Sequence, residues 1–286
     1  MIHARYVRCD VFSRQPFGGN PLAVFTDGRG LETSTMQAIA REMNLSETVF
    51  VLPAVAGGHM RIRIFTPRVE LDFAGHPTIG AAFVLARPLQ TDRLVLETGV
   101  GNVSTRVERE GADPRAAWLD LPLPEVLPHD DPDALLRALG LPGAITPVAR
   151  YRYGFTHIVV QVEDASTVAA LSPNLTLLEQ LGPVGVVVFA NNGDTVRVRV
   201  FVPGAGVAED PATGSAVAPI ALHLHRYSGL CASRSLRLEQ GIELGRPSEL
   251  RANLQFEGEQ LNRIHVGGEC ALLGRGEWQL AGQVRG

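Results

Sequence analysis

Three ionisable residues stand beside a turn or a predicted helix start, where a side chain can be partly buried. Glu47 opens the apolar run "ETVFVLP", His76 lies in "AGHP", and Asp210 lies in "EDPATGS". A half-buried carboxylate can have its pKa raised toward about 6–7, the range useful for proton transfer. An imidazole at a helix N-terminus tends to stay neutral. These residue types indicate acid–base chemistry.

Each residue also has a purely structural explanation. Asp210 can cap a helix whose first residue is Pro211, because acids and proline favour a helix start. The pattern Asn44-x-x-Glu47 can be a helix cap, or Glu47 can be a solvated strand end. A lone histidine such as His76 is more often a core or surface residue than a functional one. These alternatives stay open at the level of local pattern.

Motifs for metals, nucleotides and nucleophiles are missing from the sequence. There is no His-Glu-x-x-His, glycine-rich phosphate loop, Gly-x-Ser-x-Gly elbow or dinucleotide fingerprint. His223 and His225 are two residues apart and would point to different sides of a helix. The sequence predicts no metal and no cofactor, which leaves acid–base chemistry by side chains alone.

Composition narrows the class of protein. The chain has 286 residues and a net charge of −4, which does not favour a nucleic acid or a membrane surface as partner. Its three cysteines, Cys9, Cys231 and Cys270, are far apart and fit a reducing compartment. The N-terminus has no apolar signal-peptide core, and no apolar run approaches the roughly 18 residues of a membrane span. We predict a cytoplasmic protein whose partner is a small molecule.

Alternating apolar residues predict mostly strands, and helical spacing is rarer. One helix is predicted over Glu32–Asn44 and another over Asp130–Leu141, the second with acids at its start and Gly140 at its stop. The predicted strands of the first half are "YVRCDVF", "PLAVFTD", "ETVFVLP", "RIRIFTP", "RLVLETG" and "AAWLDLPLP".

The chain contains an internal repeat. "RIRIFTP" from Arg61 recurs as "RVRVFVP" 136 residues later. "GNPLAVFTD" from Gly19 resembles "THIVVQVED" 137 residues later, and "SETVFVLP" from Ser46 resembles "VGVVVFAN" 138 residues later. Three matches in one order at nearly one offset predict a duplicated domain, since the period is too long for a solenoid. In each copy an alanine-rich run then predicts a central helix, with Pro77 and Pro211 near the two starts. We take His76 and Asp210 to occupy related positions.

Two related helices whose N-termini face each other would offer one cleft with two sets of free backbone N–H groups. Such a cleft suits a small carboxylate. In this arrangement Asp210 could cap its helix and still project into the cleft. The repeat therefore favours a functional role for the ionisable residues over a purely structural one.

The stretches "GGNPLAVF", "REMNLSETVFVLP", "ELDFAGHPTIGAA", "EDPATGSAVAP" and "QGIELGRPS" resemble the PhzF-like isomerase family of phenazine biosynthesis along nearly the whole chain. The resemblance implies an α+β fold of the diaminopimelate-epimerase type, with two similar halves that each wrap a curved, mostly antiparallel sheet around a central helix. It implies a first half over residues 1–126, completed by a strand near 270–280, and a second half over 127–269. It also implies an active site between the halves and a homodimer.

The resemblance assigns roles residue by residue. The catalytic residues of the family fall on Glu47, His76 and Asp210. Substrate-binding positions fall on Asn20, Ser46, Gly75, Gly214 and Ser215. Racemases of this fold use two cysteines as paired bases, and the corresponding positions here are Ala74 and Thr213. Neither side chain can supply a thiolate, so a two-cysteine racemase is excluded.

The implied reaction is a cofactor-independent proton shift on trans-2,3-dihydro-3-hydroxyanthranilate, with Glu47 moving a proton from C3 to C1 over one face of the ring. Two alternatives remain. One is an isomerase for another conjugated substrate, such as a diene of an alkylproline pathway. The other is a non-catalytic protein that binds a small carboxylate, against which the joint presence of Glu47, His76 and Asp210 speaks.

Overall fold

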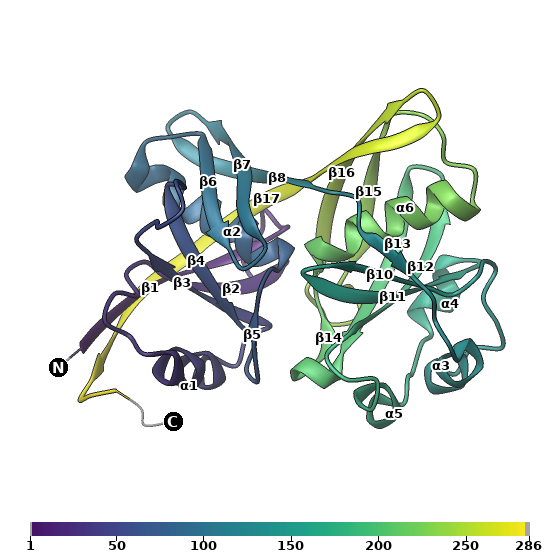
Figure 1. Cartoon of the computed structure of the whole chain (residues 1–286), viewed down its shortest axis with the longest axis horizontal. Coiled ribbons are helices and arrows are strands. Elements are labelled where there is room, and N and C mark those ends of the chain that lie inside the picture. Colours follow the sequence, from purple (N-terminus) through teal and green to yellow (C-terminus); the bar gives the residue numbers. More distant parts are fainter. Residues whose placement is uncertain (1, 284–286) are drawn as a thin grey trace. The chain divides into compact units, whose positions relative to one another are not determined.

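The computed structural model describes residues 2–283 and divides into two compact units. Unit 1 comprises residues 1–119 and 267–286, and unit 2 comprises residues 120–266. The chain therefore leaves unit 1 through strand β8 (Asp113–Leu121) and returns to it within strand β17 (Gln260–Leu280), drawn in yellow in Figure 1. Each unit is described by itself below.

The sheet of unit 1 is curved and closes on itself. Its strands follow one another in the order β17–β1–β2–β3–β4–β6–β7–β8, and β8 pairs back to β17. The pairs β17–β1, β1–β2, β3–β4, β6–β7 and β7–β8 are antiparallel, and the pairs β2–β3 and β4–β6 are parallel. The bounds of the remaining strands are β1 Ile2–Val11, β2 Asn20–Phe25, β3 Glu47–Leu52, β4 Met60–Phe65, β5 Glu70–Leu71, β6 Arg93–Thr98 and β7 Gly101–Glu110.

Helix α2 (Gly75–Leu89) lies at the centre of this sheet and contacts β1, β2, β3, β4, β6 and β7 (Figure 1). A helix that is apolar on every side must be buried on every side. Accordingly, every residue from Gly75 to Phe83 is buried. Gly80 permits the close approach to the sheet, because a Cβ atom there would lie 2.4 Å from Leu22 and 2.8 Å from Val11. The sheet and the helix together fix where the first turn of α2 lies.

Helix α1 (Thr33–Met43) covers the outer face of the same sheet. Its apolar side chains Met36, Ile39 and Ala40 pack with the aromatic rings of Phe25, Phe50 and Phe65. The helix ends at Asn44, which adopts a left-handed conformation with φ 49° and donates its N–H to Ala40 O. The helix predicted over Glu32–Asn44 is confirmed, as are the six strands predicted for the first half of the chain.

Unit 2 repeats the strand connections of unit 1. Strands β10 and β11 pair antiparallel, β11 and β12 parallel, β12 and β13 antiparallel, β13 and β15 parallel, and β15 and β16 antiparallel. The strand bounds are β9 Glu125–Leu127, β10 Ala149–Tyr153, β11 Phe155–Val162, β12 Gly185–Asn192, β13 Thr195–Val202, β14 Val207–Asp210, β15 Arg234–Gln240 and β16 Ser248–Glu257.

The helices of unit 2 also follow the plan of unit 1. Helix α6 (Val217–Tyr227) is buried over its first two turns and contacts β10 and β11, as α2 contacts β1 and β2. Three short helices pack outside the sheet: α3 (Pro132–Leu139), α4 (Ala165–Ala169) and α5 (Leu175–Glu179). The helix predicted over Asp130–Leu141 is α3, with Asp131 as its N-cap and Gly140 as its C-cap.

The internal repeat falls on equivalent strands. The three matched pairs of segments are β2 with β11, β3 with β12, and β4 with β13. Because each pair holds the same place in its sheet, the duplication predicted from the sequence is confirmed. The fold class, α+β with two similar halves, each a curved, mostly antiparallel sheet around a central helix, is confirmed as well.

Two expectations about the second copy are wrong. Asp210 does not cap a helix, and Pro211 is not a first helical residue, because Asp210 is the last residue of β14 and α6 begins at Val217 after the short 3-10 turn η2 (Gly214–Ala216). The positional counterpart of His76 is not Asp210. Asp210 pairs with Val200 of β13 as Leu71 pairs with Ile64 of β4, so Leu71 is its counterpart.

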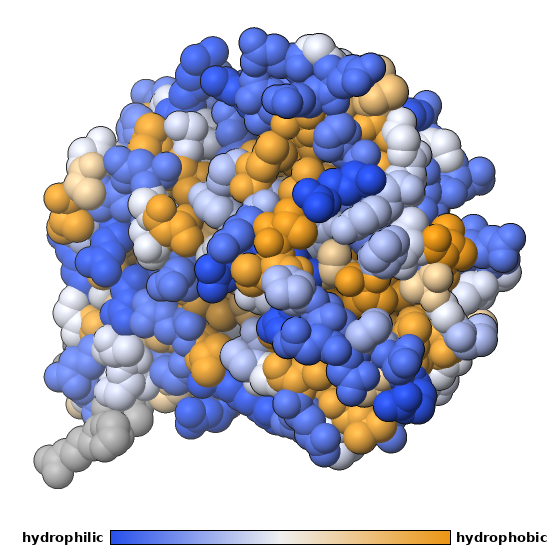
Figure 2. All heavy atoms as spheres, turned by 45° about the vertical axis from the view of Figure 1, so that its right-hand side comes forward, coloured by the Kyte–Doolittle hydropathy of each residue, from blue (hydrophilic) through white to orange (hydrophobic). Residues whose placement is uncertain are grey.

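The surface is mixed in character. Figure 2 shows hydrophobic areas interspersed with hydrophilic ones over the face that it presents. Among residues 2–283, no helix combines the length and the apolar character that crossing a membrane requires.

Candidate active site

Unit 1 brings three of the predicted site residues into contact. His76 Nδ1 lies 3.3 Å from Glu47 Oε2 and 3.2 Å from Asn20 Nδ2. The side chain of His76 is 3% exposed and that of Glu47 is 13% exposed, and Asn20 is fully buried. Asn20 and Glu47 are the first residues of β2 and β3, and His76 lies in the first turn of α2. The beginnings of two strands and one helix therefore meet at the His76 imidazole.

A strained turn places Asn20. The loop between β1 and β2 holds positive φ angles at Phe12, Phe17 and Gly19. Gly19 has φ 63°, and a Cβ atom there would lie 2.4 Å from Val11 O, so no other residue fits. The buried Asp10 carboxylate accepts the Phe17 N–H at 2.7 Å and ties the loop down. The "GGNP" pattern therefore reflects a turn that aims the Asn20 amide.

Glu47 is the first residue of β3, which runs parallel to β2 with Glu47 beside Leu22. It is neither a helix cap nor a solvated strand end, because Asn44 ends α1 and the Glu47 side chain is largely enclosed against His76. Ser46 lies half-buried in the bend just before it. The carboxylate thus occupies the half-buried position that the sequence predicts.

His76 is held neutral. Burial lowers the pKa of His76 to about 3, so the ring carries no charge near neutral pH. The expectation of a neutral imidazole is confirmed, although burial is the cause found here. Within residues 2–283, its Nε2 atom is buried and has no hydrogen-bond partner. A buried polar atom of this kind needs an explanation, and a ligand atom is a natural one.

The contacts of Nδ1 allow two arrangements of one proton. If Nδ1 carries the proton, it donates to the Glu47 carboxylate. If Nε2 carries it, the single lone pair of Nδ1 can accept either the Asn20 amide N–H or the O–H of a protonated Glu47 carboxyl. The state of Glu47 and the tautomer of His76 are therefore linked. A carboxylate coupled to a neutral imidazole in this way can take up a proton and give it back.

The start of α2 adds backbone donors. Gly75 is buried and is the first residue of the helix, where N–H groups have no partner within the helix. Ala74, the N-cap residue, contributes no side-chain hydrogen bond. The free N–H groups and the helix dipole favour an anion at this point.

Unit 2 holds Asp210 in a buried network. Thr213 Oγ1 donates to Asp210 Oδ2 at 2.5 Å. Gln240 Nε2 donates to Thr213 Oγ1 at 3.0 Å and to Asp210 O at 2.7 Å, and Gln240 Oε1 accepts the Thr213 N–H at 3.0 Å. Since Gln240 and Thr213 are themselves buried, the Asp210 carboxylate is fixed in position.

Gly214 and Ser215 lie in η2, directly before α6, as Gly75 and His76 open α2. Ser215 Oγ lies 3.0 Å from His157 Nε2 of β11. Each unit therefore presents a glycine followed by a polar side chain at the start of its central helix. The predicted site residues are thus split between the units: Asn20, Ser46, Glu47, Gly75 and His76 in unit 1, and Asp210, Gly214 and Ser215 in unit 2.

Sequence reasoning gave no role to His157 or Gln240. His157 lies in "THIVVQVED", the segment matched to "GNPLAVFTD", and comparing the two repeats one residue at a time would have placed it opposite Asn20. Gln240 opens "QGIELGRPS", and Gly241 after it has φ 75° and would clash with Arg246 O and Pro211 O if it carried a Cβ atom. That glycine was the available sign of a tight structure around Asp210.

The two buried cysteines are poor candidates for catalytic bases. Burial raises the pKa of Cys9 and raises that of Cys270 to about 12, so both thiols stay protonated near neutral pH. Neither stands at the start of a central helix, where Ala74 and Thr213 are found. No group of three or more metal-ligating side chains occurs among residues 2–283.

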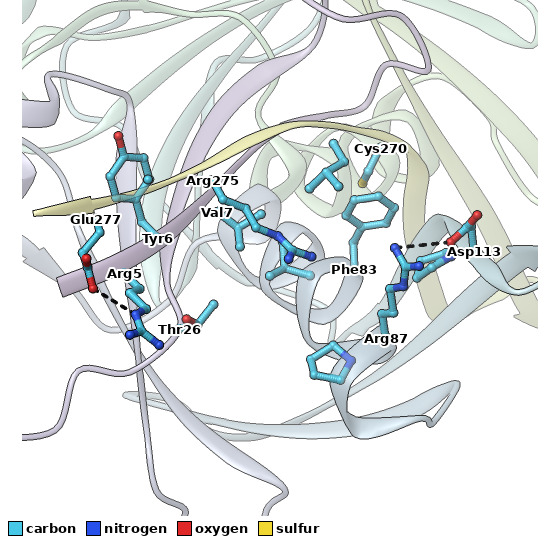
Figure 3. Close-up of a pocket in the computed structure, with 15 residues that line it drawn as sticks. Arg5, Tyr6, Val7, Thr26, Phe83, Arg87, Asp113, Cys270, Arg275 and Glu277 are labelled. Carbon is cyan, nitrogen blue, oxygen red and sulfur yellow. Dashed lines mark hydrogen bonds and ion pairs between the residues drawn. The ribbon is translucent and has the colours of Figure 1, made fainter. Parts of the chain in front are cut away.

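A groove of about 1000 Å³ on unit 1 is a different place (Figure 3). Val7 and Phe83 contribute apolar surface, and its two carboxylates are engaged: Glu277 with Arg5 at 2.9 Å and Asp113 with Arg87 at 3.6 Å. Its thiol, Cys270, is protonated near neutral pH, as described above. The groove therefore offers no free base, and none of the predicted site residues lines it.

The two units, each with a helix inside a curved sheet, define a protein of the epimerase-like fold class. A hydroxyproline epimerase from Agrobacterium vitis shares this fold, with a TM-score of 0.66 at 15% identity over 96% of this chain and 91% of that chain. A predicted epimerase from Pseudomonas aeruginosa matches with a TM-score of 0.82 at 30% identity over 97% of this chain and 100% of that one.

The family model for phenazine biosynthesis-like proteins, PhzC-PhzF, matches residues 9–276. A trans-2,3-dihydro-3-hydroxyanthranilate isomerase from Pseudomonas aeruginosa is 42% identical over 95% of this chain and 98% of its own length. An uncharacterised isomerase from Mesorhizobium japonicum is 38% identical over 95% and 97% of the two chains. The chain belongs to the phenazine biosynthesis-like family, and it is an isomerase.

Proposed function

We propose that the chain catalyses a cofactor-independent proton shift on trans-2,3-dihydro-3-hydroxyanthranilate, in phenazine-like secondary metabolism. The observation that carries the proposal is the contact between the Glu47 carboxylate and the neutral, buried imidazole of His76. The relative that is 42% identical bears the name of this activity. A one-proton shift within a substrate requires a base that also acts as an acid, and a carboxylate coupled to an imidazole meets that requirement.

The proposed reaction balances with a single proton. Glu47 removes the proton from C3, and the electron pair of the C3–H bond spreads along the ring diene toward C1 and its carboxylate. Glu47 then delivers the same proton to C1 on the same face. The double bonds move from C4–C5 and C6–C1 to C3–C4 and C5–C6. The resulting enol then becomes the aminoketone by losing its O–H proton while C4 gains a proton, so this second step is also balanced. No electron is gained or lost, so no redox cofactor is needed.

The other residues serve this shift through charge and position. The neutral His76 keeps its Nε2 atom available for a substrate polar group and links its tautomer to the state of Glu47. The backbone N–H groups at Gly75 and Gly214 and the hydroxyl of Ser215 would hold the substrate carboxylate, where negative charge grows as C3 loses its proton. Asn20 and Ser46 would contact the substrate beside Glu47. Asp210, held by Thr213, would accept from the substrate amine or hydroxyl.

We further propose that Asp210 takes part in turnover, as the resemblance of the sequence implies. Loss of turnover in Asp210→Asn with an intact fold supports this idea. Full turnover in that variant contradicts it and restricts the active groups to unit 1. Ala218→Ser, a buried and similarly small change within α6, controls for general damage to unit 2.

The test of the activity is proton NMR of trans-2,3-dihydro-3-hydroxyanthranilate with the purified chain. We expect the C3 proton signal to disappear and product signals to grow at a rate proportional to protein concentration. Turnover of an alkylproline-pathway diene with no effect on this compound would move the chain to another conjugated substrate. Tight binding of the compound without any exchange would make the chain a non-catalytic carboxylate-binding protein.

We propose that the protein is a homodimer in the cytoplasm. The first part rests on the family resemblance and is tested by light scattering, for which a monomer mass of 30.7 kDa would contradict it. The second part is supported by three cysteines that are all free, two of them buried. Cell fractionation tests it, and recovery outside the cytoplasm would contradict it.

A further inference from the structure

The two units have the same kind of side-chain contact at the start of their central helices. In unit 1, Asn20 of β2 lies within hydrogen-bond distance of His76 in the first turn of α2, at 3.2 Å. In unit 2, His157 of β11 lies within hydrogen-bond distance of Ser215 in η2, at 3.0 Å. Strands β2 and β11 hold equivalent places in their sheets, as do α2 and α6. In both units a buried strand residue therefore holds the polar side chain that follows the glycine.

The surroundings of His157 are closed on the side away from Ser215. His157 is 1% exposed, and its Nδ1 atom has no hydrogen-bond partner within residues 2–283. Gly185 lies beside it as its register partner in β12, and a Cβ atom on Gly185 would lie 2.4 Å from Nδ1. Gly185 is the first residue of β12, as Glu47 is the first residue of β3. Unit 2 has a glycine where unit 1 has its carboxylate, and the His157 ring occupies that space.

These contacts fix the tautomer of His157. Burial lowers the pKa of His157 to about 3, so the ring carries one proton. A proton on Nδ1 would be a buried donor with no acceptor, and such orphaned N–H groups are rarer in proteins than unsatisfied acceptors. The proton therefore belongs on Nε2, which donates to Ser215 Oγ. The hydroxyl proton of Ser215 is then left to point to another acceptor.

We propose that His157 is a positioning residue that, by donating to Ser215 Oγ, commits the Ser215 hydroxyl to donate a hydrogen bond to an anionic group of the substrate. The inference rests on the proposed function for the identity of that group, the ring carboxylate. It also predicts selectivity: the Ser215 hydroxyl favours a ligand atom that accepts a hydrogen bond and disfavours one that donates a hydrogen bond. Because the carboxylate gains charge as C3 loses its proton, the bond strengthens in the transition state.

A double-mutant cycle on ligand binding tests the coupling. The probe is anthranilate, a stable aromatic compound with the amino and carboxylate groups of the substrate, measured by calorimetry. We expect Ser215→Ala to weaken binding by roughly 10-fold, the scale of a hydrogen bond to a charged group. His157→Leu should weaken it by a similar factor, and the double variant by no more than Ser215→Ala alone. His157→Gln, which can present an amide N–H near the Nε2 position, should restore most of the affinity.

His223→Gln is the matched control. His223 is also fully buried in unit 2, with Nε2 2.7 Å from Thr146 Oγ1 and Nδ1 2.9 Å from the Tyr151 hydroxyl. Its effect on binding should combine with that of Ser215→Ala by simple multiplication. If His157→Leu combines with Ser215→Ala in the same multiplicative way, or if His157→Gln is no better than His157→Leu, the role of His157 is packing alone and the proposal fails.

A second measurement determines which nitrogen of the His157 ring carries the proton. Nitrogen-15 chemical shifts of the His157 ring should show Nε2 protonated and Nδ1 bare, and the opposite tautomer would overturn the proposal. Both tests are independent of turnover. If the chain fails to consume trans-2,3-dihydro-3-hydroxyanthranilate while the coupling and the tautomer are as expected, the substrate assignment is wrong and the role of His157 stands.

Discussion

His76 Nδ1 lies 3.3 Å from Glu47 Oε2, and the ring is neutral, so the two groups are in contact without forming a permanent ion pair. A buried ion pair would hold both charges in place and make proton release costly. A neutral ring beside a carboxylate avoids that cost. The four predictions below concern this contact and the structure that supports it.

Glu47→Gln should abolish proton transfer while the fold is kept. The amide has the shape of the carboxylate and can still contact His76, but it cannot accept a proton at neutral pH. We expect turnover to fall by about 10²–10⁴-fold or more, the usual contribution of a positioned acid–base group. The NMR assay measures the rate, and circular dichroism checks the fold. Glu42→Gln, an exposed change on α1, should leave the rate unchanged; undiminished turnover in Glu47→Gln would remove Glu47 from its role.

Lowering the pH should destabilise the protein. The loss of stability should begin at pH values well above those at which the buried histidines become protonated in the folded state. Burial lowers the pKa of His76 and His157 to about 3 and that of His223 to about 4, against an ordinary value of 6.5. Below pH 6.5 the unfolded chain binds protons that the folded chain does not, so stability falls as the pH drops from about 6.5 toward 4. Urea unfolding at several pH values measures this slope.

The same experiment has an internal control. His223→Gln removes one of the three buried rings, so the slope of stability against pH should become shallower even if the variant is less stable at every pH. His3→Gln, at a side chain that is half exposed, should change the slope less. An unchanged slope in His223→Gln would mean that His223 does not contribute.

Glu97→Gln should loosen the loop between β3 and β4. The Glu97 carboxylate accepts N–H groups from Val55 at 2.7 Å, Ala56 at 2.5 Å and Gly58 at 2.9 Å, and these bonds, that of Val55 first, lower the pKa of Glu97. The stabilisation is present above the ordinary pKa of about 4.5 and is lost as the pH falls through the lower folded value.

Amide hydrogen exchange at Val55, Ala56 and Gly58 measures this effect. The protection factors of these amides should fall in Glu97→Gln at pH 7 and, in the natural chain, on acidification. Glu259→Gln, an exposed change elsewhere, should leave these amides protected. Equal protection in both variants would show that the loop is held by other contacts.

Gln240→Leu should destabilise unit 2 and displace Asp210. The change leaves the buried Thr213 N–H and Asp210 carbonyl without the partners that Gln240 supplies. Each unsatisfied buried group costs about 1–3 kcal/mol. Denaturant unfolding measures the loss, and turnover should fall as well if Asp210 acts on the substrate. Gln255→Leu, at an exposed position of β16, is the control; equal stability of the two variants would contradict the network.

The sequence predicted the fold well because its signals are local or repeated. Helices α1 and α3 have clear start and stop signals, and the strand "RIRIFTP" recurs in the similar form "RVRVFVP". The "EDPATGS" segment misled because an acid before a proline resembles a helix start. Its true structure depends on Gln240, which lies about 30 residues away and holds Thr213 and Asp210 through buried hydrogen bonds that no local pattern expresses.

The sequence predicts only part of the arrangement of the candidate site. The contact of Glu47 with His76 follows from β3 starting beside β2 and from α2 filling the sheet, both of which the strand and helix pattern indicates. The neutrality of His76 could be suggested from its place at a helix start, but its cause is burial, which depends on the whole sheet. The pairing of His157 with Ser215 joins residues 58 positions apart and appears only once the sheet is built.

The path of β17 has a consequence for how the protein is made. Strand β1 pairs along its length with Cys270–Leu280, which is translated after all of unit 2. The rings of Tyr6 and Phe25 contact the indole of Trp278 in the folded protein, so they lack this partner until Trp278 has been made. The nascent unit 1 must therefore persist with an open sheet edge until Cys270–Leu280 has been made, whereas residues 120–266 can complete most of their own sheet earlier. Translation order and folding order run opposite to each other in this chain.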